Sequence, residues 1–334
     1  MKISNQHTEV EIQSLGAMIK LLQFKLPNGS TVEPLFTAPW SNDIDCDFDN
    51  LSPIIQYLAG EWPCVPFGGP GNPDNLPSNW KPVITEDWDG YPHGYSSNHD
   101  WRISKPAANH LVAEISYPAN SPIDKLERHI RLDPAKPAID LELVIYTKNE
   151  VQLPVGLHPV FDLKNCITGD CHLDISSETR FWSLPVELEP GKSLFALGQE
   201  NKPLEQLLSF EGKAIDALSI PLQQTGEDLL MLTNTKGNVG LVYPKKNYRI
   251  DLYWDTDLLP NCILWYSNGG RMNYPWLGRI NALGIEPVVS AFDFGLGYSL
   301  SKETPLAKND IPTYLQFEAN SKKSIKSRID LSLI

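Results

Sequence analysis

Short apolar stretches with the alternating pattern of β-strands recur along the whole chain. Turn signals of hairpin length separate them, such as Pro27-Asn28-Gly29, Asp133-Pro134 and Lys236-Gly237-Asn238, where these residue types tolerate the backbone angles of tight turns. The clearest stretches cover residues 17–24, 111–117, 126–132, 139–146, 229–233, 239–243, 248–254 and 263–266. The pattern predicts many short strands joined by turns.

Helical periodicity is scarce. Residues 51–58 and 203–208 are the segments that could form helical turns, and both are short. Strands without intervening helices are typical of all-β proteins, so we expect a large sandwich of mostly antiparallel β-sheets. Because we find neither a linker nor an internal repeat, we expect residues 1–334 to form a single β domain.

Residues 60–100 differ in composition from the rest of the chain, because closely spaced proline and glycine residues interrupt any regular element. Loops of this length in a compact domain are usually functional or disordered. Aromatic residues argue against disorder here, namely Trp62, Phe67, Trp80, Trp88 and Tyr91. We therefore expect an ordered loop, with Trp62 and Phe67 as candidates for the wall of a binding cleft.

Charge and composition narrow the choice of partners. A formal net charge of −13 disfavours nucleic acid and anionic membranes, so neutral or cationic small molecules are the expected ligands. The five cysteines are odd in number and lack C-x-x-C spacing, which fits a reducing compartment. The first residues lack a signal-peptide pattern, and no apolar run approaches the roughly 20 residues of a membrane span. We therefore expect a cytoplasmic protein.

Three segments set ionisable side chains among glycine, proline and apolar residues: 91–101, 154–163 and 283–290. Ionisation in such surroundings costs free energy unless a partner is present, so these groups are candidates for shifted pKa values. A single histidine in an apolar strand is more often a core residue. The combination of the three segments is more specific than any one of them.

Together, the three segments resemble the aldose 1-epimerase (galactose mutarotase) family. The resemblance consists of His93-Gly94 followed by Trp101, a G-x-H-P-x-F-x-L motif at residues 156–163, and Glu286 before a proline. Residues 14–17 also resemble the family's opening strand, and residues 312–334 resemble its closing pair of strands. The resemblance implies a supersandwich of β-sheets with a sugar bound in an open cleft on one face.

By position, the resemblance implies that Glu286 is a general base and His158 a general acid, and that His93 hydrogen-bonds the substrate. The implied reaction interconverts the α and β anomers of an aldose by opening its ring, which needs an acid and a base but neither a cofactor nor a metal. A small sugar is then the expected partner of a monomer or homodimer.

Each of these residues also has a purely structural interpretation. Glu286 could form a buried salt bridge with Arg279, His158 could be a core histidine held by backbone carbonyl groups, and His93 could stabilise its loop. Asp216 resembles a family aspartate that binds sugar hydroxyls, although a role in a turn or cap is equally consistent with its sequence. Trp265 could offer its ring to the sugar or pack, with Tyr266, in the core.

One branch of the family acts on hexose 6-phosphates, and the short H-G-x-x-x-x-x-x-W spacing resembles that branch. Its two characteristic arginine positions are occupied here by Ser97 and Ala59. Since arginine normally holds a phosphate dianion, we expect an unphosphorylated sugar. The alternative is a hexose-6-phosphate 1-epimerase in which Arg102, Arg271 or Arg279 supplies the positive charge for the phosphate.

Other functions are also consistent with the sequence. The acidic run from Asp43 to Asp49 suggests calcium, but it lacks the glycine and distal glutamate of a helix-loop-helix site, so we expect a solvated loop. His93 and His99 lack a third metal ligand at a useful spacing. A carbohydrate-binding protein without turnover, and a polysaccharide lyase or hydrolase, are the alternatives outside the epimerase class.

Overall fold

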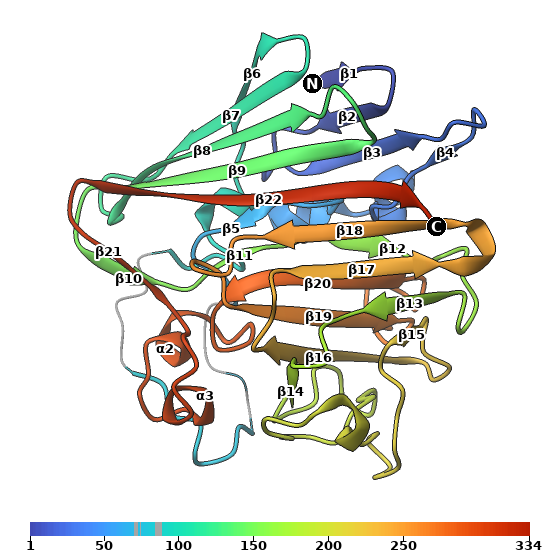
Figure 1. Cartoon of the computed structure of the whole chain (residues 1–334). Coiled ribbons are helices and arrows are strands. Elements are labelled where there is room, and N and C mark those ends of the chain that lie inside the picture. The colour runs from blue at the N-terminus through green and yellow to red at the C-terminus, as the bar shows by residue number, and fades with distance from the viewer. Residues whose placement is uncertain (70–72, 74, 84–88) are drawn as a thin grey trace.

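Nine antiparallel strands form the larger sheet in the computed structural model, which describes residues 1–69, 73, 75–83 and 89–334. Trp88 lies outside these residues. This sheet crosses the view in Figure 1, with β6 at its upper edge. Its strands, in spatial order, are β15 (Ser219–Ile220), β13 (Cys171–Asp174), β17 (Asn238–Tyr243), β18 (Tyr248–Trp254), β22 (Ser321–Leu333), β9 (Ala138–Thr147), β8 (Ile123–Leu132), β7 (His110–Ser116) and β6 (Arg102–Ala107).

A second, seven-stranded sheet lies behind β17 and β18 in Figure 1. Among the described residues its order is β14 (Arg180–Ser183), β16 (Gly226–Thr233), β19 (Asn261–Asn268), β20 (Asn281–Val289), β11 (Val155–Leu157) and β5 (Pro63–Cys64), and β12 (Val160–Asp162) also pairs with β20. All these pairings are antiparallel. This sheet carries most of the candidate residues.

Two smaller sheets and a few helical turns complete the described structure. The four-stranded sheet contains β1 (Lys2–Ser4), β2 (Thr8–Ile12), β3 (Ile19–Lys25) and β4 (Thr31–Val32), and the two-stranded one contains β10 (Val151–Leu153) and β21 (Leu315–Phe317). The helices are α1 (Pro53–Gln56), α2 (Gly295–Ser299) and α3 (Pro305–Lys308), with 3-10 turns η1 (Pro39–Asn42), η2 (Phe48–Asn50), η3 (Tyr95–Ser97), η4 (Leu204–Gln206) and η5 (Pro244–Lys246). No helix in the described ranges is long and apolar enough to cross a membrane.

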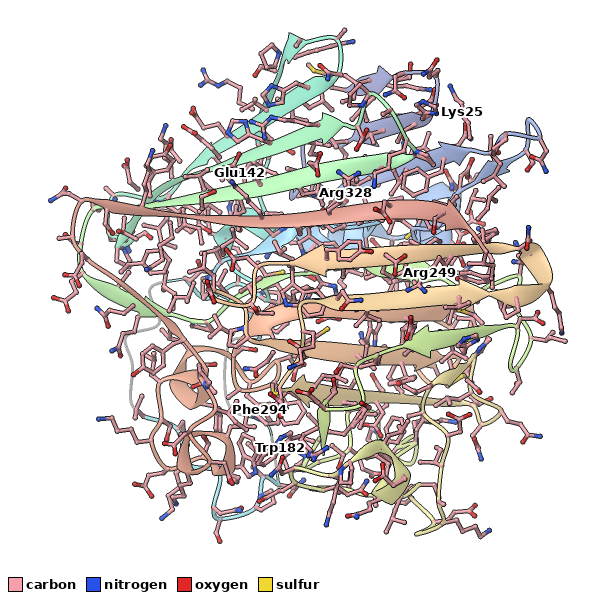
Figure 2. The ribbon with its side chains drawn as sticks, in the orientation of Figure 1. Lys25, Glu142, Trp182, Arg249, Phe294 and Arg328 are labelled. Carbon is pink, nitrogen blue, oxygen red and sulfur yellow. The ribbon has the colours of Figure 1, made fainter. Side chains whose placement is uncertain are left out.

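The main core lies between the two large sheets. Successive side chains of a strand point to opposite faces, so Ile325 and Ile329 of β22 are buried in this core while Arg328 points outward. Figure 2 labels Arg328 on β22 and Arg249 on β18, and both arginines form ion pairs with aspartates on the outer face. The outer face of the larger sheet is therefore polar and charged.

A second apolar cluster covers the opposite face of the seven-stranded sheet. On β16, Leu230 belongs to the main core, whereas Leu229 and Met231 belong to the second cluster. The helical turns and loops supply its outer layer, and Figure 2 labels two of its members, Trp182 and Phe294. The same alternation places Glu227, Trp265 and Glu286 on this second face.

The structure confirms the all-β fold and the eight predicted strands, and it places α1 and η4 within the two predicted helical segments. One expectation was wrong. Residues 14–17 form a turn, in which Gly16 and Ala17 have positive φ angles of 65° and 47°. Residues 312–334 contain two strands, as expected; β21 pairs with β10, and β22 pairs with β9 and β18. That residues 1–334 form one domain stays a prediction.

Candidate active site

A cavity of about 240 Å³ opens on the second face of the seven-stranded sheet. Apolar and aromatic side chains form most of its wall, and a few titratable groups converge on it. This combination is typical of a small-molecule site. The described residues that line it are Ser52, Ile54, Ile55, Leu58, Trp62, Pro92, His93, His158, Leu188, Leu229, Trp265, Arg271, Trp276, Glu286 and Asp293.

His158 reaches the cavity from the short connection between β11 and β12. Its backbone N–H donates to the carbonyl oxygen of Trp62 at 2.9 Å, and its ring stacks on the Trp62 indole with centroids 4.1 Å apart. The residue is 6% exposed, and its Nδ1 atom has no hydrogen-bond partner among the described residues. His158 is therefore not a core histidine held through its ring by backbone carbonyl groups.

Glu286 projects from the middle of β20, where it faces Ile263 of β19. It is 3% exposed, and its Oε1 atom lies 3.5 Å from Nε2 of His158. The space for this carboxyl group exists because Gly284, on the same face of β20, has no side chain. The alternative salt bridge is wrong, because Arg279 pairs with Asp43 at 2.8 Å.

Burial shifts the two pKa values in opposite directions. It raises the pKa of Glu286 well above 4.5, an effect that Asp293 strengthens and Arg271 opposes. It lowers the pKa of His158 well below 6.5, and positive charge on His93 or Arg271 lowers it further. Since burial disfavours whichever form is charged, the free pair favours a neutral carboxyl group beside a neutral imidazole. Together they hold one transferable proton.

His93 lies beside His158 with ring centroids 5.1 Å apart. A positive φ of 56° turns its backbone, which is held by a hydrogen bond from its N–H to the Gly68 carbonyl at 2.8 Å. Its buried Nδ1 has no partner among the described side chains. Burial, and secondarily Arg271, lowers its pKa from 6.5 to about 4, so the ring is neutral at physiological pH. A neutral imidazole can both donate and accept a hydrogen bond.

The aromatic candidates occupy two different positions. Trp62 and Trp265 line the cavity, and the indole N–H of Trp265 donates to Glu227 at 2.6 Å. Phe67 is not one of the described residues that line the cavity. It packs behind the two histidines, with its ring centroid 5.0 Å from that of His93. The expectation that Phe67 forms part of the cleft wall is therefore corrected: its ring supports the wall from behind.

Asp216 is not brought together with the other candidates. It is exposed in a turn, and its carboxylate accepts hydrogen bonds from the backbone N–H of Leu218 at 2.9 Å and from the hydroxyl of Ser219 at 2.6 Å. Aspartate commonly stabilises turns in this way. Of its two interpretations, the geometry supports the turn, and we do not retain Asp216 as a sugar ligand.

The cavity lining does not include the acidic run from Asp43 to Asp49, Arg102 or Arg279. Within the run, Asp43 pairs with Arg279, and the Asp47 carboxylate accepts a hydrogen bond from Asn50 at 2.7 Å. In the described part of the chain, no three His, Cys, Asp or Glu side chains are grouped so as to hold a metal. Arg102 pairs with Glu114. Arg271 is thus the one of the three arginines that reaches the cavity.

The sequence-based prediction missed Glu227 and Asp293. Glu227 is fully buried, and its carboxyl group accepts hydrogen bonds from Trp265 and, at 3.0 Å, from Ser267. Burial raises its pKa to about 7. The signal was available, because two adjacent acidic residues, Glu227 and Asp228, begin an otherwise apolar strand. Asp228 instead accepts backbone N–H groups of the 194–195 segment.

Comparison with known proteins supports the fold. No family model matches the sequence, and no curated protein matches it. The structure resembles a galactose mutarotase related enzyme from Lactobacillus acidophilus, with a TM-score of 0.62, 14% identity, and 99% of this chain and 97% of that chain covered. It also resembles an aldose epimerase homologue from C. elegans, with a TM-score of 0.61, 12% identity, and coverage of 100% and 98%.

A third similar structure is a galactose mutarotase-like protein from Clostridium acetobutylicum, with a TM-score of 0.58, 15% identity, and 100% of this chain and 95% of that chain covered. At these identities the likeness establishes the fold. The chain therefore has the galactose mutarotase-like fold of mostly antiparallel β-sheets, over essentially its whole length.

Proposed function

We propose that the protein is an aldose 1-epimerase that interconverts the α and β anomers of an unphosphorylated aldose, with Glu286 as general base and His158 as general acid. One observation carries the proposal: Glu286 of β20 and His158 of the β11–β12 connection lie 3.5 Å apart and both line the same cavity. The fold that the chain shares with galactose mutarotase-like proteins supports it further.

Ring opening requires two proton transfers. The carboxylate of Glu286 removes the proton from the anomeric hydroxyl O1, and the electron pair forms the C1=O1 bond. The C1–O5 bond breaks, and O5 takes a proton from the imidazolium of His158. Rotation about C1–C2 then presents the other face of the aldehyde, and the two transfers run in reverse to close the ring.

The pKa shifts of the pair fit this sequence of steps. After ring opening, Glu286 carries the proton and His158 is neutral, and this is the state that burial favours for both side chains. The buried surroundings therefore stabilise the pair in its open-chain stage relative to the ion pair that begins the reaction. A pair with one proton to exchange can start from either anomer.

The remaining cavity residues suit a single sugar ring. The volume of about 240 Å³ is just below the roughly 300–1,000 Å³ of drug-sized sites, which favours a monosaccharide over a polymer. Trp62 and Trp265 offer apolar rings to C–H groups. His93 has a neutral imidazole for a hydroxyl group. We also propose a reducing, cytoplasmic location, in keeping with five free cysteines.

The test is polarimetry of freshly dissolved α-glucose and α-galactose with the purified protein. We expect the approach to anomeric equilibrium to be faster than in buffer alone. An unchanged rate with every common aldose would contradict the proposal. Calorimetry separates a binding protein, which would take up sugar without accelerating the change, and release of new reducing ends from a polysaccharide would indicate a lyase or hydrolase instead.

A further inference from the structure

Arg271 lies in the cavity wall against two indole rings. Its guanidinium carbon is 5.4 Å from the ring centroid of Trp265 and 4.7 Å from that of Trp276. The face of an indole ring attracts a cation placed over it. The lining of the cavity contains no other arginine and no lysine among the described residues.

Two carboxyl groups hold this guanidinium on its Nε side. Nε lies 3.1 Å from Oε1 of Glu227 and 3.5 Å from Oε1 of Glu189. The Nε distances permit ion pairing, although Nε is not aligned for a hydrogen bond. Neither Glu227 nor Glu189 is among the described lining residues, whereas Arg271 is. The carboxyl groups therefore flank the arginine without closing its access to the cavity.

Carboxyl groups outnumber basic groups around the cavity. Glu286 and Asp293 line the cavity, and Glu189 and Glu227 flank Arg271 from outside the lining. One guanidinium thus stands against four carboxyl groups, of which burial favours the neutral form of Glu286. The two histidines add no positive charge at neutral pH, because burial lowers the pKa of both His93 and His158. A phosphate or carboxylate group on a ligand would thus meet a cation that is already compensated, with further carboxyl groups nearby.

We propose that Glu189 and Glu227 turn Arg271 into a charge-compensated donor that recognises neutral sugar hydroxyls and discriminates against anionic sugars. This inference rests on the proposed function and specifies its substrate class. A hydroxyl group both donates and accepts, so it can bond to a guanidinium N–H and to a carboxylate together. A dianion only accepts, and it needs an uncompensated cation.

The two glutamates differ in how firmly they are held. Glu227 is fully buried and is fixed by hydrogen bonds from Trp265 and Ser267. The side chain of Glu189 is 27% exposed and lies at the longer distance from Arg271. Glu189 can therefore be replaced with less effect on packing, which makes it the residue to test.

The experiment compares wild type, Glu189→Gln and Glu187→Gln. Glu187 is an exposed carboxylate two positions away, with an N–H of Gly191 as its partner, so its replacement makes the same change in net charge away from Arg271. Calorimetry gives Kd values for glucose and glucose 6-phosphate. Polarimetry of glucose is run in parallel, as a separate measure of the proposed catalysis.

We expect Glu189→Gln to shift the ratio of the two Kd values toward glucose 6-phosphate by at least about tenfold, which corresponds to 1.4 kcal/mol. Glu187→Gln should leave the ratio unchanged. Equal ratios in all three proteins, or a wild type that prefers the phosphate, would overturn the inference. A wild type that binds glucose without accelerating mutarotation would contradict the proposed catalysis alone, and binding of neither sugar would contradict both.

Discussion

Gly284 and Glu286 lie on the same face of β20, and a methyl group on Gly284 would overlap the Oε1 atom of Glu286. It would also come within 3.0 Å of Cβ of Trp265 on the neighbouring strand. The absence of one side chain thus determines where the carboxyl group can lie. Glycine in a strand weakens the strand itself, and it often marks such a close approach.

This relationship predicts a catalytic defect without removal of a reacting group. In Gly284→Ala the carboxyl group must move, and a displacement of about 1 Å in a catalytic group can cost about 10²-fold in rate. We expect a loss of that size in the kcat of mutarotation, measured by polarimetry. Gly169→Ala is the control: an added methyl group contacts nothing within 4 Å, and the strain at its φ of +77° affects stability and not the site, so kcat should be retained. Equal rates for the two variants would contradict the assigned position of Glu286.

The rate of mutarotation should depend on pH, because Glu286 and His158 must hold one proton between them. On the acid side activity falls when His158 and Glu286 are both protonated, and the lowered pKa of His158 places this limb below pH 6.5. On the alkaline side activity falls when both are deprotonated, and the raised pKa of Glu286 places that limb well above pH 4.5. We expect a broad plateau between the two limbs, after subtraction of the spontaneous rate at each pH.

Replacing Arg271 should move both limbs of this pH profile in the same direction. Its positive charge lowers the pKa of both His158 and Glu286. In Arg271→Gln both pKa values should therefore rise, and both limbs of the kcat profile should move to higher pH. Limbs that stay in place, or move to lower pH, would show that Arg271 does not act electrostatically on the pair.

A buried ion pair should contribute to the stability of the wall behind the site. Arg128 of β8 pairs with Glu61, the neighbour of Trp62, and the two side chains are 3% and 2% exposed. Arg128→Met leaves a buried carboxylate without its partner, which typically costs about 3–5 kcal/mol. We expect a loss of that order in the free energy of unfolding from urea denaturation. The double variant with Glu61→Gln should recover much of it.

Arg131 on the same strand is the matched control. It pairs with Glu142, but its side chain is 41% exposed, and exposed pairs contribute about 0–1 kcal/mol. Arg131→Met should therefore change stability by less than Arg128→Met. Comparable losses in the two variants would mean that burial does not distinguish the pairs.

Much of the fold could be predicted from sequence because its strands alternate in a regular way. β18 coincides with its predicted range, 248–254, and β9 extends the predicted range by one residue at each end. The expectation for residues 14–17 came from a four-residue resemblance, which does not determine the backbone conformation; Gly16 and Ala17 have positive φ angles. The partners of β10 and β21 could not be predicted, since pairing between distant segments is set by tertiary packing rather than by local pattern.

The candidate site was predictable where a titratable residue interrupts an apolar segment, as at His158 and Glu286. That criterion also applies to Glu227, which was missed because adjacent acidic residues suggest a turn rather than a strand start. The sequence could not assign a role to Asp216, since a short acidic motif looks the same whether it binds a ligand or closes a turn. Distances such as that between Arg271 and Glu189 depend on loop positions and have no sequence signature.

The most direct test of the central claim is the rate of anomer exchange in His158→Gln, Glu286→Gln and the double variant, measured by NMR on the anomeric protons of glucose. General acid–base groups typically contribute about 10²–10⁴-fold, and groups that act as one unit give non-additive losses. We predict that wild type accelerates exchange, that each single variant loses most of this acceleration, and that the double variant is no slower than the slower single one. Acceleration that survives in Glu286→Gln, or losses that multiply in the double variant, would contradict the account.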